Sequence, residues 1–281
     1  MNIQVYVASA FSKNGQGGNK AGVVFMKEDL SVSQKMDIAK QLGFAETAYI
    51  SASQVADYKI EYFTPKEEVD LCGHATIGSF AIMMHLHMID RTHYTIETKS
   101  GVLDISISDD MIFMEQNKPQ FFEEIDVAEF TSSLDFTQID EKYPIQIVST
   151  GLRDILIPIK NITGLHALQP NFDEIKNMSE RYDVIGTHLY TFEDDRIICR
   201  NFAPLYDINE EAATGTSNGA LACYLFTKHK MKKELYVFEQ GYALNSPSEI
   251  LVKLDRDSND EIQRVFVGGT GYFVEEKMIL I

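Results

Sequence analysis

Cysteine is scarce in this chain of 281 residues, which contains only Cys72, Cys199 and Cys223. An odd and sparse set of cysteines does not form a disulfide framework. No Cys-x-x-Cys pair is present, so the sequence does not predict a structural zinc site.

Positive charge is also in short supply. The chain has 25 Lys and Arg against 42 Asp and Glu, which gives a formal net charge of −17 at pH 7. Nucleic acids and anionic membrane surfaces are both bound through clustered Lys and Arg. We therefore expect neither as a partner, and we interpret the acidic residues as a solvated surface.

Charged side chains are missing from two long stretches, residues 71–89 and 212–227. A helix without a charged face has no side for water, so each stretch predicts a buried helix. Each helix begins at a glycine turn, and Gly73 and Gly215 are 142 positions apart (215 − 73). This spacing suggests two similar halves, each wrapped around one central helix. The first stretch approaches the length of a membrane span, but its three histidines favour a buried globular helix.

The other segments alternate in the manner of strands, with few helices between them. We expect strands near residues 3–7 and 21–25, helices at 31–42 and 172–182, and short strands throughout both halves. This pattern predicts an α+β duplication of two pseudo-symmetric domains, each a mostly antiparallel sheet rolled around a central helix. We place the domains at residues 1–118 and 119–281, with a strand near 271–281 returning to the first. Residues 119–143 are polar and acidic and are interpreted as the boundary.

The N-terminal sequence has no basic region before its apolar run. We therefore expect no signal peptide and a cytoplasmic location.

Glu46 is the first candidate acid or base. It stands alone between apolar neighbours where a strand should begin, and a desolvated carboxyl there would have a raised pKa. The alternative is an ordinary edge or surface glutamate. His74 lies in the first turn of a buried helix, where it relays a proton or is simply a satisfied core histidine. Asp207, Glu210 and Glu211 precede the second helix.

Three further groups have weaker claims. Cys72 next to a helix start is either an activated thiolate or an inert thiol. His85, His87 and His93 do not form a metal set, because residues two apart on a helix point to different faces. Thr214, Thr216 and the neighbouring hydroxyl and amide groups can cap the second helix or bind a ligand.

Seven motifs, in this order and at these spacings, resemble the phenazine-biosynthesis PhzF-like isomerases, which have the diaminopimelate epimerase-like fold. They span nearly the whole chain: Gly18–Val24, Glu46–Thr47, Phe63–Pro65, Leu71–Thr76, Ala213–Gly219, Gln240–Gly241 and Pro247–Ser248.

The resemblance implies a site in a cleft between two domains, with no cofactor, no metal and a small carboxylate-bearing substrate. It implies that a glutamate matching Glu46 is the general acid/base, assisted by His74 and Glu211. The substrate-binding positions that it implies are Asn19, Gly73, Thr214, Gly215 and Thr216. The free N–H groups of the two helix starts would face each other around an anion. We also expect a homodimer.

The sequence departs from the family pattern at five positions, two of which are Ala212 in place of a proline and Thr216 in place of a serine. Glu211 stands where the family has an aspartate, and Glu61 and Ser246 stand where many members have arginine. The wider fold includes epimerases that use two opposed cysteines. Cys72 matches the first cysteine, but the second position is Thr214, so we disfavour a Cys72-dependent racemase or epimerase. A non-catalytic binder of a small metabolite on the same fold is the other alternative.

Overall fold

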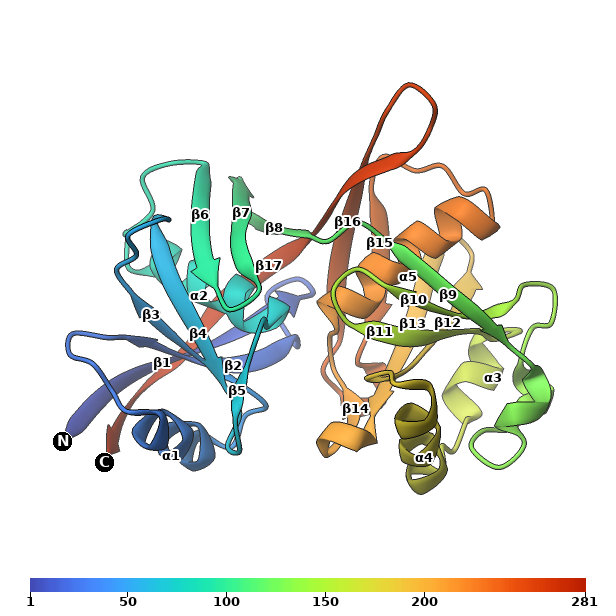
Figure 1. The fold of residues 1–281 in the computed structure, drawn as a ribbon, viewed down its shortest axis with the longest axis horizontal. Helices are drawn as coiled ribbons and strands as arrows, with labels where there is room; N and C mark the ends of the chain where they lie inside the picture. Colours follow the sequence, from blue (N-terminus) through green and yellow to red (C-terminus); the bar gives the residue numbers. More distant parts are fainter. The chain divides into compact units, whose positions relative to one another are not determined.

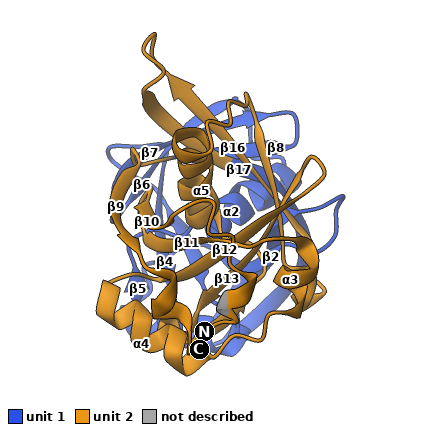
Figure 2. Ribbon diagram, turned by 90° about the vertical axis from the view of Figure 1, so that its right-hand side faces the viewer, with its two compact units in different colours: residues 1–115, 268–281 blue, residues 116–267 orange. Residues whose placement is uncertain are grey.

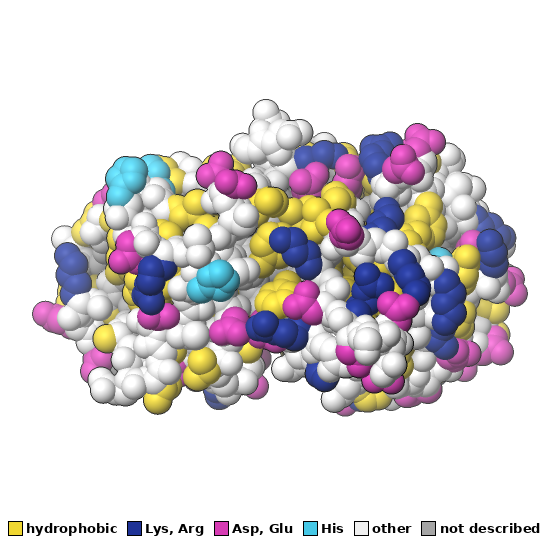
Figure 3. All heavy atoms as spheres, turned by 90° about the horizontal axis from the view of Figure 1, so that it is seen from above, with side chains coloured by type: hydrophobic (Ala, Val, Ile, Leu, Met, Phe, Trp, Pro, Cys, Tyr) yellow, Lys and Arg dark blue, Asp and Glu magenta, His cyan; other side chains and the backbone are white. Residues whose placement is uncertain are grey.

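The computed structural model describes all 281 residues, except for the side chain of Phe136. The chain divides into two compact units (Figure 2): unit 1 comprises Met1–Glu115 and Gly268–Ile281, and unit 2 comprises Gln116–Val267. No described helix combines the length and the apolar character that crossing a membrane requires. Acidic and basic side chains are interspersed over the face shown in Figure 3.

Unit 1 is a mostly antiparallel sheet with two helices (Figure 1). The central pair is β1–β2, and β1 also pairs with the C-terminal strand, where Asn2 faces Leu280. β2–β3 and β4–β6 are the parallel pairs. The elements are β1 (Asn2–Ser12), β2 (Asn19–Phe25), α1 (Val32–Leu42), β3 (Thr47–Ser51), β4 (Tyr58–Phe63), β5 (Glu68–Val69), α2 (Gly73–His85), β6 (His93–Thr98), β7 (Gly101–Ser108), β8 (Met111–Gln116) and the later part of β17 (Ile262–Leu280).

The two helices of unit 1 differ in burial because their sequences differ in polarity. Ten residues of α2, from His74 to Met83, are buried, as expected of a helix without a charged face. α1 is amphipathic and buries only one side. Ser31 caps it with Gln34 in a capping box, and Gly43 ends it at φ 71° in the left-handed region.

Unit 2 repeats the plan around α5, with a sheet whose antiparallel pairs include β12–β13 and β15–β16. Ten residues of α5 are buried. The elements are β9 (Gln120–Ile125), β10 (Ile145–Ser149), β11 (Arg153–Pro158), α3 (Ile162–Ala167), α4 (Phe172–Tyr182), β12 (Gly186–Glu193), β13 (Arg196–Ala203), β14 (Ile208–Glu211), α5 (Gly215–Lys228), β15 (Tyr236–Gln240), β16 (Ser248–Arg256), and the 3-10 turns Val127–Phe130, Phe136–Gln138, Pro204–Tyr206 and Tyr242–Leu244.

The predicted α+β fold and its two buried helices are confirmed. The polar passage at residues 119–143 is not a bare linker, because it contains β9, which pairs with β10 inside unit 2. α3 was not foreseen, since six residues are too short to display helical periodicity.

Candidate functional site

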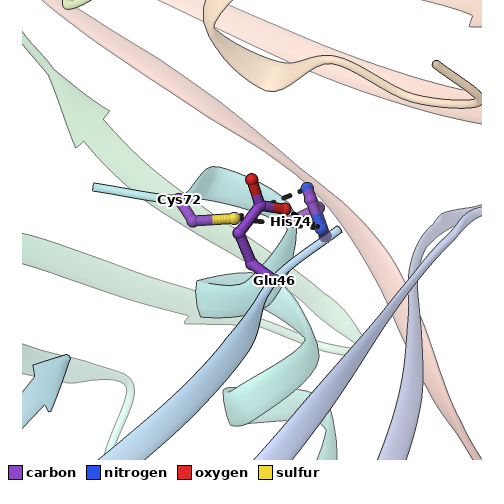
Figure 4. Close-up of side chains that lie close together, drawn as sticks. All are labelled: Glu46, Cys72 and His74. Carbon is purple, nitrogen blue, oxygen red and sulfur yellow. Dashed lines mark hydrogen bonds and ion pairs between the residues drawn. The ribbon is translucent and has the colours of Figure 1, made fainter. Parts of the chain in front are cut away.

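Glu46, Cys72 and His74 lie together in unit 1, where Figure 4 shows their polar ends turned toward one another. Glu46 occupies the short link between the left-handed Gly43, which ends α1, and Thr47, the first residue of β3. Cys72 is the N-cap of α2 and His74 is its second residue. A helix stop and a helix start thus bring the carboxylate to the imidazole.

The group is compact and mostly buried. Nε2 of His74 lies 3.2 Å from Oε2 of Glu46, within ion-pair distance. Sγ of Cys72 lies 3.5 Å from Nδ1 and 3.8 Å from Nε2 of the same ring. The side chain of Glu46 is 15% exposed and that of His74 is 6% exposed, so solvent reaches the group mainly at the carboxylate.

The protonation states follow from this geometry. Desolvation alone would raise the pKa of Glu46, but its interaction with His74 outweighs burial and lowers that pKa below the ordinary value. The expectation of a raised pKa at Glu46 was therefore wrong. The apolar residues next to Glu46 in the sequence do not reveal that the imidazole of His74 lies beside the carboxylate in the fold. Burial alone would lower the pKa of His74, but contacts with Cys72 and with the Glu46 carboxylate raise the pKa of His74 well above its ordinary value. The resting pair is a carboxylate beside an imidazolium.

Cys72 is a thiol in this environment. Burial and the nearby Glu46 carboxylate raise the pKa of Cys72, so the helix start does not make it an activated thiolate.

Glu46, Cys72 and His74 are also the one described group of three that could hold a metal ion, with ligand atoms within 4.8 Å of one another. A carboxylate, a thiolate and an imidazole suit zinc, but the ligands would first have to give up the imidazolium and thiol protons. His85, His87 and His93 form no such group among the described residues.

The start of α2 has room beside it. Cys72 makes no side-chain capping bond to the first turn, and a Cβ atom on Gly73 would meet only Cε of Met114, at 3.7 Å. The side-chain amide of Asn19 lies 3.4 Å from Nδ1 of His74. Asn19, Gly73 and His74 therefore belong to one neighbourhood.

The predicted residues of unit 2 gather at the start of α5. Oγ1 of Thr214 donates to Oε2 of Glu211 at 2.5 Å, and Thr214 is the N-cap of the helix. Gly215 opens the helix, and the backbone carbonyl of Thr216 accepts a hydrogen bond from the hydroxyl of Thr150 at 3.1 Å. The prediction that the two helix starts serve one ligand stays a prediction.

A buried set of amides surrounds Thr214. Nε2 of Gln240 donates to the carbonyl of Glu211 at 2.8 Å and to Oγ1 of Thr214 at 3.0 Å. Its Oε1 accepts from the N–H of Thr214 at 3.3 Å and from Nδ2 of Asn218 at 3.0 Å. Gln240 and Asn218 stood in the family motifs, but their roles were not foreseen.

Two other acidic residues discussed above form ion pairs. Glu210 forms a bidentate ion pair with Arg200, in which both hydrogen bonds are 2.9 Å long. Glu61, at a position where the resemblance implied an arginine in many members, faces the buried Lys35 at 2.6 Å. The cation at this position is therefore Lys35 of α1, and it pairs with the carboxylate of Glu61 on β4.

The family described as phenazine biosynthesis-like protein matches residues 8–277 of this chain. An uncharacterized isomerase of Clostridium acetobutylicum is 31% identical over 296 residues, with 98% of each chain covered. An uncharacterized isomerase of Escherichia coli K12 is 30% identical over 286 residues, with 96% of each covered.

Solved structures of similar proteins agree with this family and with the fold described above. The phenazine biosynthesis protein of the PhzF family from Bacillus anthracis superposes with a TM-score of 0.91 at 27% identity, and each chain is fully covered. A hydroxyproline epimerase from Agrobacterium vitis reaches a TM-score of 0.64 at 10% identity, with 99% of this chain and 92% of that chain covered. The second similarity concerns the fold alone.

Proposed function

This chain belongs to the phenazine biosynthesis-like family and is an enzyme of the isomerase class, and from this premise we propose a cofactor-independent proton transfer on a small carboxylate-bearing metabolite. Glu46 is the general acid/base of this proposal. The observation that carries it is the 3.2 Å contact between Glu46 and His74, which prepares an ionised base beside a charged acid.

The reaction removes a proton from one carbon of the substrate and adds a proton to another, so that the enzyme returns to its starting protonation state. The Glu46 carboxylate takes a proton from one carbon, and the His74 imidazolium gives its proton to another. Glu46 then passes the acquired proton to His74 across the 3.2 Å contact, which restores the ion pair. Positioned acid/base groups of this kind are worth about 10²–10⁴-fold in rate, so orientation by the rest of the site must add to them.

Substrate binding is assigned to the helix starts. Backbone N–H groups at a helix N-terminus favour anions, and the open space at Gly73 would let a carboxylate approach. The side-chain amide of Asn19 lies 3.4 Å from Nδ1 of His74. In unit 2 we assign binding to Thr214, Gly215 and Thr216, and a positioning role to Glu211.

Solvent-deuterium incorporation tests the proposal. A panel of small unsaturated and amino carboxylic acids is incubated with the enzyme in D₂O, and carbon-bound deuterium is read by mass spectrometry. The expected result is exchange in at least one compound, which is lost with Glu46→Gln. A compound that raises the melting temperature of the wild type but never exchanges would favour the non-catalytic binder.

A further inference from the structure

A series of buried side chains leads from His188 to Glu211 through unit 2. His188, Asn218 and Gln240 are each fully buried. Nε2 of His188 lies 3.2 Å from Oδ1 of Asn218, and the series continues through Gln240 and Thr214 to Glu211. Because each amide has distinguishable ends, the position of every proton along the series can be worked out.

The backbone fixes the orientation of Asn218. Its side chain contacts the carbonyl oxygen of Thr214 at 2.9 Å, and a carbonyl can only accept. The amide nitrogen must therefore face Thr214, and the amide oxygen must face His188. It follows that Nε2 of His188 carries a proton and donates it. On the other side of the ring, Nδ1 lies 3.2 Å from Nδ2 of Asn201 and serves as the acceptor.

The backbone fixes Gln240 as well. One end of its amide contacts the carbonyl of Glu211, which only accepts, and the other end contacts the N–H of Thr214, which only donates. The nitrogen therefore also faces Oγ1 of Thr214, which must accept from it. The single hydroxyl proton of Thr214 is left for Oε2 of Glu211 at 2.5 Å, so this oxygen is an acceptor.

The turn after Gln240 holds it in place. Gly241 adopts φ 84°, and a Cβ atom there would lie 2.2 Å from the carbonyl oxygen of Ser246 and 2.7 Å from that of Ala212. Only glycine allows β15 to end this close to the segment that carries Glu211.

We infer that Gln240 is a positioning residue of the enzyme, which fixes Glu211 as a hydrogen-bond acceptor at the start of α5 through Thr214. This inference deepens the proposed function, and its kinetic consequence rests on that function. Glu210 cannot take over the role, because both of its carboxylate oxygens are engaged by Arg200.

The first experiment compares Gln240→Leu with Gln146→Leu. Gln146 is a matched control, because it is buried in the same unit and donates to the carbonyl of Phe122 at 2.8 Å outside this series. We expect kcat/KM to fall about 10–100-fold in Gln240→Leu, by analogy with residues that orient metal ligands through hydrogen bonds. We expect less than about threefold in the control at a similar melting temperature. Equal losses in the two variants would overturn the inference.

The second experiment needs neither substrate nor a substitution at Gln240. Nitrogen-15 NMR of the imidazole rings, with His188 assigned by its absence in His188→Gln, reports which ring nitrogen carries the proton. We expect a neutral ring protonated at Nε2 at pH 7. A ring protonated at Nδ1, or a charged ring, would overturn the series even if deuterium exchange were found. Conversely, a lack of exchange would defeat the proposed function and leave the NMR result standing.

Discussion

Nε2 of His74 lies 3.2 Å from Oε2 of Glu46, although the two residues are 28 positions apart in the chain (74 − 46). This contact reverses the effect of burial on the glutamate, since desolvation would otherwise raise the pKa of Glu46. An ionised base and a charged acid are thereby held together before any substrate arrives.

Replacing Glu46 by glutamine should abolish turnover without disturbing the fold. The amide cannot accept a proton from carbon, so we expect kcat to fall about 10²–10⁴-fold. Turnover is measured by deuterium incorporation, and folding by circular dichroism. Glu123→Gln, at an exposed position on β9, is the control and should behave like the wild type. Full activity of Glu46→Gln would end the proposal.

His74→Gln should raise the pKa of Glu46. His74 lowers that pKa in the wild type, so the acid limb of kcat/KM should lie below pH 4.5 there. Without the imidazolium, desolvation is opposed only by the weaker hydrogen bond from Cys72, and the limb should move above pH 4.5. The carboxyl carbon of Glu46, followed by NMR titration, gives the same information without turnover. His93→Gln, an exposed histidine, should leave the titration unchanged. An unshifted titration in His74→Gln would show that the ion pair does not control Glu46.

A feature can be predicted from the sequence alone when it depends on interactions between residues that are close together in the chain. Stretches free of charge identified α2 and α5, and the helix expected at residues 31–42 is α1, because burial and helical periodicity are local. The pKa of Glu46 could not be predicted in the same way, since its sign depends on a tertiary contact. The pairing of Lys35 with Glu61 also joins residues far apart in the chain, with the partners 26 positions apart.

Cys72→Ser should retain activity within about tenfold of the wild type. The pKa of Cys72 is raised, so its thiol is a poor base at neutral pH, and Thr214 is its counterpart in the second half. Activity should also survive a chelator, because no metal takes part in the proposed reaction. A loss beyond about a hundredfold, roughly 2.7 kcal/mol of transition-state stabilisation, would instead support the Cys72-dependent racemase or epimerase.

Gly73→Ala should separate binding from folding. The added Cβ meets only Cε of Met114 at 3.7 Å, an ordinary contact, and alanine is the better helix former by about 1 kcal/mol. We therefore expect an unchanged or higher melting temperature. A substrate carboxylate at the helix start would meet the new methyl group, so KM should rise about tenfold or more. An unchanged KM would remove the start of α2 from the binding site.

Asp154→Asn should change how stability varies with pH. Asp154 is buried with Oδ1 lacking a partner among the described residues, while Oδ2 accepts from Ser217 at 2.7 Å. Burial raises the pKa of Asp154 from 3.8 to about 7 in the folded state. Because its pKa is higher in the folded state, Asp154 makes its full contribution to stability below about pH 3.8, where it is protonated in both states. Stability is then lost as the pH rises toward 7, because the folded protein must hold a proton that the unfolded chain releases.

The loss expected from Asp154 amounts to about 4 kcal/mol between pH 4 and pH 8, at about 1.4 kcal/mol per unit of pKa. Asparagine stays neutral and can still accept from Ser217, so the variant should lack this loss. Its new amide N–H has no obvious partner, which lowers its stability by a constant amount at every pH. The decisive quantity is therefore the difference between the two unfolding free energies, measured with urea from pH 4 to pH 8. Other titrating groups, His188 among them, are shared by both proteins and largely cancel in that difference. Wild-type stability should decline relative to the variant as the pH rises, and parallel curves would mean that Asp154 is already ionised in the fold at acidic pH.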